Sequence, residues 1–325
     1  MTMETNQKTM RAMAIERFGG VDELKLHTLP IPEIGPDEVL VRVEFAGVGE
    51  WDPFEREGGY ARMMGMHPDF PYVLGSEGAG TVAAAGENVS GFAVGDRVYA
   101  IGFLNPRGGF YAEYAAVSAD FVSPVPRTLT AEQAAVVGGV GLTALRGLDD
   151  TLRIQPGESV LIFGAGGGIG HVAVQRARRM GARVLAVASG ADGVALAQRV
   201  GADAAVDGRA DDVLAAARAF APDGLDAALL TVGGDAANQA LQAIRQGGRA
   251  AYPNGVQPEP RAPEGVRLDA FNGDPDRDII HRLNRLMEQG PFEVHVARTF
   301  PLEEAAEAQR QLGEHYLGKL ALRTG

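Results

Sequence analysis

The sequence predicts an α/β protein with two domains, one rich in β-strands and one built on a doubly wound parallel sheet. Its 325 residues, of which 46% are hydrophobic, can supply two cores of ordinary size. Short segments rich in β-branched residues recur through residues 13–128, whereas strand and helix patterns alternate from residue 159 onward. A glycine-rich turn, residues 164–170, stands at the start of that alternation.

The turn joins an unbroken apolar segment, residues 160–163, to an amphipathic helix pattern at residues 171–180. A second strand pattern, residues 182–188, completes a βαβ unit. The spacing does not match G-x-G-x-x-G, but a strand before the turn and a helix after it are the context in which such turns bind phosphate. Glycines let the backbone approach a pyrophosphate, and the N–H groups of the helix start point at its charge. We therefore expect pyrophosphate contacts from Gly164, Ala165, Gly166, Gly167, Gly168, Ile169 and Gly170.

The rest of the second domain continues the alternation. Helices are predicted at residues 194–200, 211–220 and 236–244, and strands at residues 204–206, 226–232, 248–252 and 266–271. Strands that alternate with helices predict a parallel sheet with helices on its faces.

The β-rich domain is predicted from strands at residues 38–45, 80–85, 97–101 and 112–117, with a long loop at residues 50–72 between the first two. A helix is expected over residues 130–148, broken at Gly138 and Gly139, and another over residues 276–288. The last residues, 292–325, return to short strands around a helix. We expect a flexible tail at residues 1–12, a catalytic domain from residues 13–128 and 275–325, and a cofactor-binding domain at residues 129–274.

Composition excludes several classes of function. The formal net charge is −12 and no block of like charge stands out, which argues against nucleic acid as a partner. The chain has no cysteine, so disulfides, thiolate catalysis and Cys-ligated zinc are excluded. No apolar run approaches the length that spans a bilayer, and residues 1–10 are polar, so we expect a cytoplasmic protein without membrane contact.

The chain from residue 13 to residue 323 resembles the medium-chain dehydrogenase/reductase superfamily, and within it the zinc-independent, quinone oxidoreductase-like branch. The resemblance is carried by residues 18–20 (FGG), 36–43 (PDEVLVRV), 75–80 (GSEGAG), 91–98 (GFAVGDRV), 109–114 (GFYAEY), 141–144 (GLTA), 164–170 (GAGGGIG) and 318–322 (GKLAL). It implies a GroES-like catalytic domain joined to a Rossmann nucleotide-binding domain.

Zinc-dependent members of this superfamily hold a catalytic zinc with two cysteines and a histidine or related group. The corresponding positions here are Gly49, Ser76 and Val140, none of which is a good zinc ligand. Transfer of a hydride to or from an alcohol needs a Lewis acid on the oxygen, so the resemblance implies another substrate. A nicotinamide hydride can add to a carbon already activated by conjugation, which points to quinones and α,β-unsaturated carbonyl compounds.

The resemblance and the strand ends give further cofactor candidates: Thr143, Val232, Gly233, Asn254, Gly255 and Lys319. Ser189 stands at the end of the second strand, where an NAD enzyme would usually place an acidic residue, and this favours NADPH. Against NADPH, relatives carry a lysine for the 2′-phosphate where this chain has Gly193, with Asp192 beside it. Arg209 is then the nearest candidate cation.

The substrate pocket is expected to draw on the loop at residues 50–72 and on a neighbouring segment: Glu50, Trp51, Asp52, Phe54, Tyr60, His67 and Phe103. Trp51 and Phe54 could stack on a flat substrate. No side chain is singled out as a general acid, and solvent could protonate the product. His171, just after the glycine turn, is expected to face either phosphate or solvent.

The leading hypothesis is an NADPH:quinone reductase or a 2-alkenone or enoyl reductase that binds no metal. Relatives pair through the strand corresponding to residues 266–271, which predicts a homodimer. A second hypothesis is an NADPH-binding sensor or structural protein with little turnover. A weaker third is an alcohol dehydrogenase with an unfamiliar metal arrangement.

Overall fold

The computed structural model describes residues 8–103, 105 and 107–325, which fold into two compact units. Unit 1 comprises the described residues up to Gly139 together with Val296–Gly325, and unit 2 comprises Val140–His295. The sequence placed these boundaries earlier, after residues 128 and 274. In the structure both boundaries lie further along the chain. The first half of the helix that begins at Ala131 belongs to unit 1, and the helix that ends at Glu288 belongs to unit 2.

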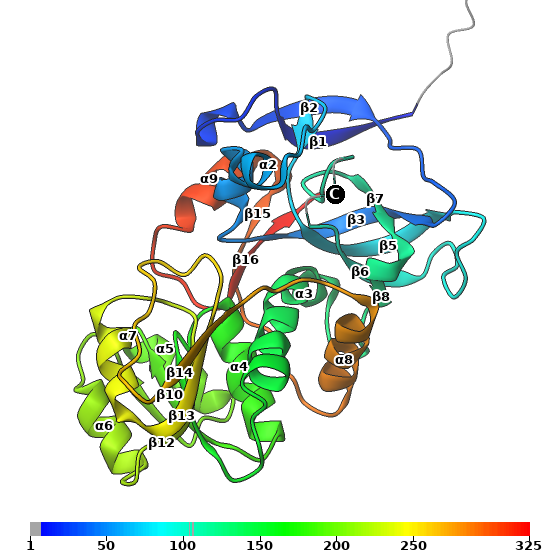
Figure 1. Cartoon of the computed structure of the whole chain (residues 1–325). Helices are drawn as coiled ribbons and strands as arrows, with labels where there is room; N and C mark the ends of the chain where they lie inside the picture. The colour runs from blue at the N-terminus through cyan, green and yellow to red at the C-terminus, as the bar shows by residue number, and fades with distance from the viewer. Residues whose placement is uncertain (1–7, 104, 106) are drawn as a thin grey trace, which may run out of the picture. The chain divides into compact units, whose positions relative to one another are not determined.

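Unit 1 is mainly β-structure, in blue to green and in red in Figure 1. Its strands are β1 (Thr9–Ile15), β2 (Lys25–Pro30), β3 (Glu38–Val48), β4 (Tyr72–Val73), β5 (Glu77–Ala85), β6 (Arg97–Ile101), β7 (Tyr114–Ser118), β8 (Val122–Pro124), β15 (Val296–Pro301) and β16 (Lys319–Arg323). Its helical segments are η1 (Val21–Glu23), α1 (Asp52–Arg56), α2 (Gly59–Met64), η2 (Ala119–Phe121), η5 (Leu302–Glu304), α9 (Ala305–Gln311) and the start of α3 (Ala131–Leu145).

The larger sheet of unit 1 brings together the ends of three strands that are far apart in the sequence. Its strand order is β15-β16-β3-β5-β6-β8, with β7 also paired to β3, and a smaller sheet has the order β2-β1-β4. Strand β3 lies between β5 and β16 and runs antiparallel to both. Because Ala46 pairs with Gly78 and Val48 with Leu320, the last residues of β3 lie beside the first residues of β5 and β16.

Unit 2 contains strands β9 (Ser159–Phe163), β10 (Arg183–Ala188), β11 (Ala204–Asp207), β12 (Leu225–Leu230), β13 (Ile244–Pro253) and β14 (Arg267–Phe271). Its helical segments are the rest of α3, the π-helical turn η3 (Arg146–Thr151), α4 (Gly168–Arg179), α5 (Gly190–Arg199), α6 (Val213–Phe220), α7 (Asp235–Ala240), η4 (Leu241–Ala243) and α8 (Arg277–Glu288).

The six strands of unit 2 form one parallel sheet in the order β11-β10-β9-β12-β13-β14. Leu161, Leu185 and Leu230 pack on α6 and α7, whereas their neighbours along the strands, such as Val160 and Val184, are equally buried on the other face. Burial of both faces explains why these strands are continuous apolar runs. The predicted combination of a β-rich domain with a doubly wound parallel-sheet domain is therefore confirmed.

The order of the strands fixes where the glycine turn lies. From β9 the chain first moves outward to β10 and β11 and then returns to the other side of β9 with β12. The carboxyl ends of β9 and β12 are therefore neighbours at the point where the order reverses, which is where open α/β sheets bind ligands. The turn at residues 164–170 follows β9 directly.

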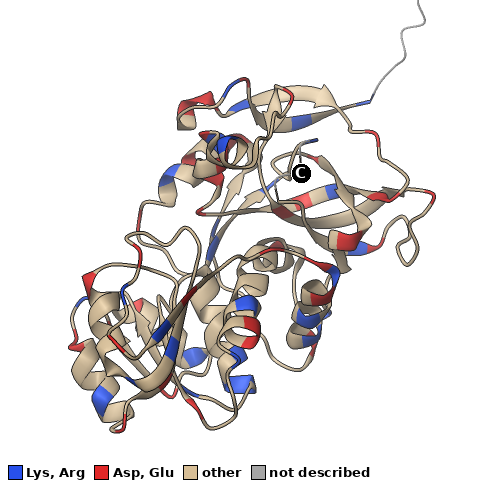
Figure 2. Cartoon of the chain, viewed as in Figure 1, with Lys and Arg blue, Asp and Glu red and all other residues tan. Residues whose placement is uncertain are grey.

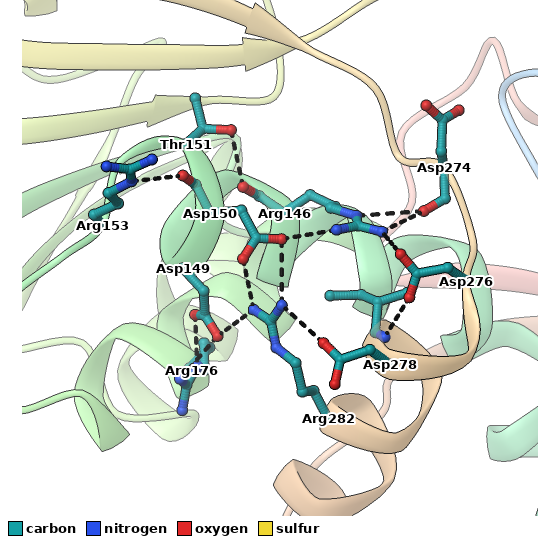
Figure 3. A network of polar contacts seen from close by, with 11 residues as sticks. Arg146, Asp149, Asp150, Thr151, Arg153, Arg176, Asp274, Asp276, Asp278 and Arg282 are labelled. Carbon is teal, nitrogen blue, oxygen red and sulfur yellow. Dashed lines mark hydrogen bonds and ion pairs between the residues drawn. The ribbon is translucent and has the colours of Figure 1, made fainter.

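A network of ion pairs holds α8 against η3 and α4, as Figure 3 shows. Arg282 of α8 contacts Asp149 and Asp150, each at 2.9 Å. Arg176 of α4 makes two contacts of 2.9 Å with the carboxylate of Asp149. Asp276 caps the first turn of α8 and also pairs with Arg146. Shared, partly buried partners make such a network more stabilising than isolated surface pairs.

Several expectations for single segments were wrong. The loop at residues 50–72 contains α1 and α2, and the helix over residues 130–148 is not broken at its glycines, since α3 continues to Leu145. Of the expected tail, residues 1–7 lie outside the described residues, and residues 9–12 lie in β1 instead. Short helices of this kind are set by packing more than by propensity.

Charged residues of both signs are interspersed over each unit (Figure 2). Within the described part of the chain, no helix combines the length and the apolar character needed to cross a membrane.

Candidate functional site

The glycine turn of unit 2 depends on close backbone approaches. Gly164 has a φ of +87°, in the region that favours glycine. A Cβ on Gly170 would lie 2.1 Å from the carbonyl oxygen of Gly164, so only glycine lets the first turn of α4 approach the end of β9. Gly167 is different, because its Cβ would meet no protein atom closer than 3.5 Å. The space beside Gly167 is therefore open, and the first N–H groups of α4 lie next to it.

This arrangement fits the pyrophosphate of a dinucleotide. The first N–H groups of a helix have no partner within the helix, and the helix dipole favours an anion there. Thr231, just after β12, closes the other side of the turn by donating its N–H and its hydroxyl to the Phe163 carbonyl, both at 3.0 Å. The candidates that follow β12 and β13 lie at the same edge of the sheet: Val232, which is 51% exposed, half-buried Gly233, and exposed Asn254 and Gly255.

The group around Ser189 would contact the adenosine end of a dinucleotide. Ser189 precedes α5 and is half-buried, and Arg209 is exposed in the turn after β11. Between them lies Asp207, whose pKa is lowered by hydrogen bonds from the N–H groups of Arg209 and Gly190. An ionised carboxylate therefore stands beside Arg209, the nearest candidate cation for a 2′-phosphate.

Thr143 of α3 and His171 of α4 are two further residues for which the sequence made a prediction. Thr143 is 8% exposed, and its Oγ1 faces Gly273, where a Cβ would lie 2.4 Å away. His171 faces neither phosphate nor solvent, because it is fully buried. Its Nδ1 lies 2.9 Å from the Gly167 carbonyl, and its Nε2 accepts the N–H of His295. Burial lowers the pKa of His171 to about 4, so the ring is a neutral support for the turn.

In unit 1, the candidate Trp51 is the centre of a group of side chains at the end of the sheet where β3 finishes and β5 and β16 begin. The indole lies over Gly49, where a Cβ would come within 2.3 Å of the ring. Its Nε1 donates to Ser76 Oγ at 2.5 Å. Lys319 Nζ lies 4.5 Å from the ring centroid, which is a cation–π contact.

Lys319 is also held by a buried carboxylate. Its Nζ lies 3.1 Å from Glu77 Oε1, with both side chains 5% exposed or less. The other oxygen of Glu77 accepts the N–H of Gly139 at 2.7 Å. A buried ion pair of this kind persists only where both partners have further contacts, as they have here.

A catalytic zinc does not fit this group. Gly49 and Ser76 offer one hydroxyl between them, and the space that a ligand side chain at position 49 would need is filled by the Trp51 ring. Across the described residues, no cluster of three or more His, Cys, Asp or Glu side chains could hold a metal ion.

The remaining pocket candidates of unit 1 form two smaller groups and one isolated residue. Phe54, Tyr60 and Phe103 pack edge to face, with centroid distances of 4.8 Å and 5.1 Å. Glu50 accepts the hydroxyl of Tyr316 at 2.6 Å. His67 is exposed on the loop after α2, and within the part of the chain that the structure describes no hydrogen bond or ion pair joins it to these candidates.

Asp52 is a buried structural carboxylate rather than an exposed acid. Its Oδ2 accepts the N–H of Gly49 at 2.8 Å and the hydroxyl of Tyr111 at 2.6 Å. Oδ1 is buried and has no hydrogen-bond partner among the described residues. Burial raises the pKa of Asp52 to about 6, and it raises that of neighbouring Glu55 to about 7 with help from the charge of Asp52.

Sequence reasoning missed Ser76 as a polar contact of the site, and it missed Tyr316 and Thr231 altogether. Ser76 was considered only as a poor zinc ligand. Its partner Trp51 lies 25 positions away, a pairing that follows from the antiparallel register of β3 and β5. Thr231 could have been found, because it follows a strand next to the glycine turn.

We predict that Asp52→Asn makes unfolding less dependent on pH. The carboxyl of Asp52 has a higher pKa in the folded protein than in the unfolded chain. Its contribution to stability is therefore complete when the pH is below the unfolded pKa, and it is lost as the pH rises through about 6. The wild type should therefore lose about 3 kcal/mol at this position between acid and mildly alkaline pH. The asparagine amide oxygen can replace Oδ2. Urea unfolding at several pH values measures the difference.

Asp69→Asn is the matched control, because Asp69 is exposed in the same unit. Its pH dependence should equal that of the wild type. If Asp52→Asn kept the full pH dependence of the wild type, the buried position of Asp52 would be wrong.

Comparison with known proteins agrees with this architecture. A family described as the alcohol dehydrogenase GroES-like domain matches residues 35–127, and one described as zinc-binding dehydrogenase matches residues 168–263. The mouse (Mus musculus) quinone oxidoreductase is 30% identical to this chain, over 98% of this chain and 99% of the relative.

Solved structures extend the likeness to the whole fold. An NAD-dependent alcohol dehydrogenase has a TM-score of 0.85 at 30% identity, over 97% of this chain and 100% of that one. The quinone oxidoreductase from Coxiella burnetii has a TM-score of 0.82 at 26% identity, over 98% and 100%. The chain is an oxidoreductase that belongs to the medium-chain dehydrogenase/reductase superfamily and is quinone oxidoreductase-like.

Proposed function

We propose that this protein is a zinc-independent, NADPH-dependent reductase of quinones or α,β-unsaturated carbonyl compounds. The observations that carry the proposal are the glycine turn of unit 2 and, within unit 1, a group in which an indole ring and a lysine stand where relatives place zinc ligands. Without a Lewis acid for an alcohol or a simple carbonyl, an acceptor activated by its own conjugation is the best match.

A bound nicotinamide would supply the hydride, and the residues of this chain would bind and orient it. The turn at residues 164–170 and the start of α4 would hold the pyrophosphate. Val232, Gly233, Asn254 and Gly255 would contact the nicotinamide half from the strand ends, together with Thr143. Lys319 remains a candidate cofactor contact from the resemblance. The protein then contributes proximity, orientation and exclusion of water.

NADPH is proposed over NADH because Ser189 replaces the usual acidic residue and Arg209 offers a positive charge. Asp207 beside Arg209 opposes a 2′-phosphate, so the preference is expected to be modest.

We also propose a homodimer and a cytoplasmic location. Strand β14 is the last strand of the six-stranded sheet and, among the described residues, pairs with β13 alone, which leaves its outer edge available to a second copy. Pairing of two such edges would continue the sheet across a twofold axis.

The test of the function is steady-state oxidation of NADPH and NADH by metal-free protein with a panel of quinones and enones. We expect turnover with at least one acceptor and a higher kcat/KM with NADPH. Tight NADPH binding without turnover on any acceptor would instead favour the NADPH-binding sensor. Turnover that appears only when zinc is added would contradict the proposal.

Gly167→Val tests the location of the cofactor. The backbone there is extended, and a Cβ meets no close protein atom, so the variant should fold. Its side chain would occupy the space of the pyrophosphate. We expect NADPH to bind at least about tenfold more weakly, because charge-assisted hydrogen bonds to the phosphate are lost. Isothermal titration calorimetry measures this.

Gly20→Val is the matched control. Gly20 is also extended, also precedes a helical turn, and has no atom within 4 Å of its Cβ position, but it lies in unit 1. Its NADPH affinity should equal that of the wild type. Equal affinity in folded Gly167→Val would place the cofactor elsewhere.

A further inference from the structure

Trp51 does more than fill the space left by Gly49. A Cβ on Gly139, from α3, would also lie 3.0 Å from the ring, so two glycines make room for the indole. The ring is half-buried and carries two kinds of polar contact. Nε1 donates within the plane of the ring, and the π face attracts a cation from above. The two contacts are therefore roughly perpendicular.

These two contacts hold Ser76 and Lys319 in fixed positions. The Ser76 hydroxyl lies 2.5 Å from Nε1, and Lys319 Nζ lies 4.5 Å from the ring centroid. Glu77 fixes the ammonium at 3.1 Å, and the Gly139 N–H fixes Glu77 in turn. Neither donor can swing away without breaking a buried contact.

Both groups keep a hydrogen that no acceptor among the described residues takes up. The hydroxyl of Ser76 accepts from the indole, so its own hydrogen is available to donate. The ammonium of Lys319 has three hydrogens, and one carboxylate oxygen and one ring face do not occupy them all. Both residues are 4% exposed, so their polar groups are largely shielded from bulk water.

We propose that Ser76 and Lys319 form an oxyanion-binding site for the oxygen of the reduced acceptor. This inference rests on the proposed function, because a hydride that adds to the conjugated carbon displaces electron pairs onto the carbonyl oxygen. A bound nicotinamide would supply that hydride and be oxidised as the acceptor is reduced, and a solvent proton would then neutralise the oxygen. A fixed cation and a hydroxyl in a dry site stabilise such a charge strongly. Trp51 and Glu77 are the positioning residues.

The ionisable side chains around this site set the conditions for a test. Glu77 lies against Lys319 from β5, and Asp52 lies nearby on α1. Burial raises the pKa of Asp52 to about 6, although the charge of Lys319 opposes the rise. At mildly alkaline pH, Asp52 therefore keeps one charge throughout a titration.

The test compares 4-nitrophenolate with its uncharged methyl ether 4-nitroanisole, which keeps the nitrophenyl ring but replaces the negative oxygen with a methoxy group. Equilibrium dialysis at mildly alkaline pH, without cofactor, measures the affinity of each. We expect the wild type to bind the phenolate at least about tenfold more tightly than the ether, since hydrogen bonds to a charged group are involved. Ser76→Ala and Lys319→Met should each reduce this ratio, and Ser76→Thr should keep it.

Arg323→Met is the matched control. Arg323 lies on the same strand and also stands over an aromatic ring, that of Phe45, but its side chain is exposed at the other end of β16. The ratio should stay that of the wild type. Lys319→Met leaves Glu77 buried without its partner and could unfold the protein. The double variant Lys319→Met/Glu77→Gln removes both charges, and it should fold and lose the preference.

Equal affinities for the two probes in the wild type, or a phenolate preference that survives both Ser76→Ala and the double variant, would overturn the oxyanion site. Neither probe needs NADPH or turnover. A phenolate preference in a protein that reduces no acceptor would leave the site standing and would count against the proposed function alone.

Discussion

The absence of a Cβ at Gly170 is the constraint on which unit 2 depends. A Cβ there would lie 2.1 Å from the Gly164 carbonyl oxygen, so its absence lets the first turn of α4 approach the end of β9 and places the first N–H groups of the helix there. The strand order then brings the end of β12 to the same place, and buried His171 supports the turn from behind. A single steric condition thus places the start of α4 at the reversal point of the sheet, which is where we propose that the pyrophosphate binds.

In unit 1, too, missing Cβ atoms allow a close approach, but here the approaching group is a side chain and not a helix. Glycines at positions 49 and 139 make room for a ring, and that ring carries Ser76 on its edge and Lys319 over its face. Where zinc-dependent relatives are expected to hold a metal, this chain holds an internal cation balanced by Glu77. Such a site can stabilise a negative oxygen, but it offers no open coordination position for an alcohol.

The fold could be predicted from the sequence because its strongest patterns are local. Continuous apolar strands, the glycine turn and alternating helices all report on the neighbouring residues along the chain. What could not be predicted was set by distant contacts. The pairing of Trp51 with Ser76 follows from strand register, and the burial of Asp52 against Tyr111 joins residues 59 positions apart. Helices α1 and α2 are too short for their propensity to decide.

The measurement that tests the central claim most directly follows one hydrogen atom. Protein dialysed against a strong zinc chelator would receive a simple enone and NADPH that carries deuterium at C4 of the nicotinamide, with the two faces labelled in separate samples. Direct reduction of the conjugated carbon predicts that one of the two samples gives a ketone with deuterium on its β-carbon. An unlabelled ketone from both samples, or label on a carbinol carbon, would contradict the account.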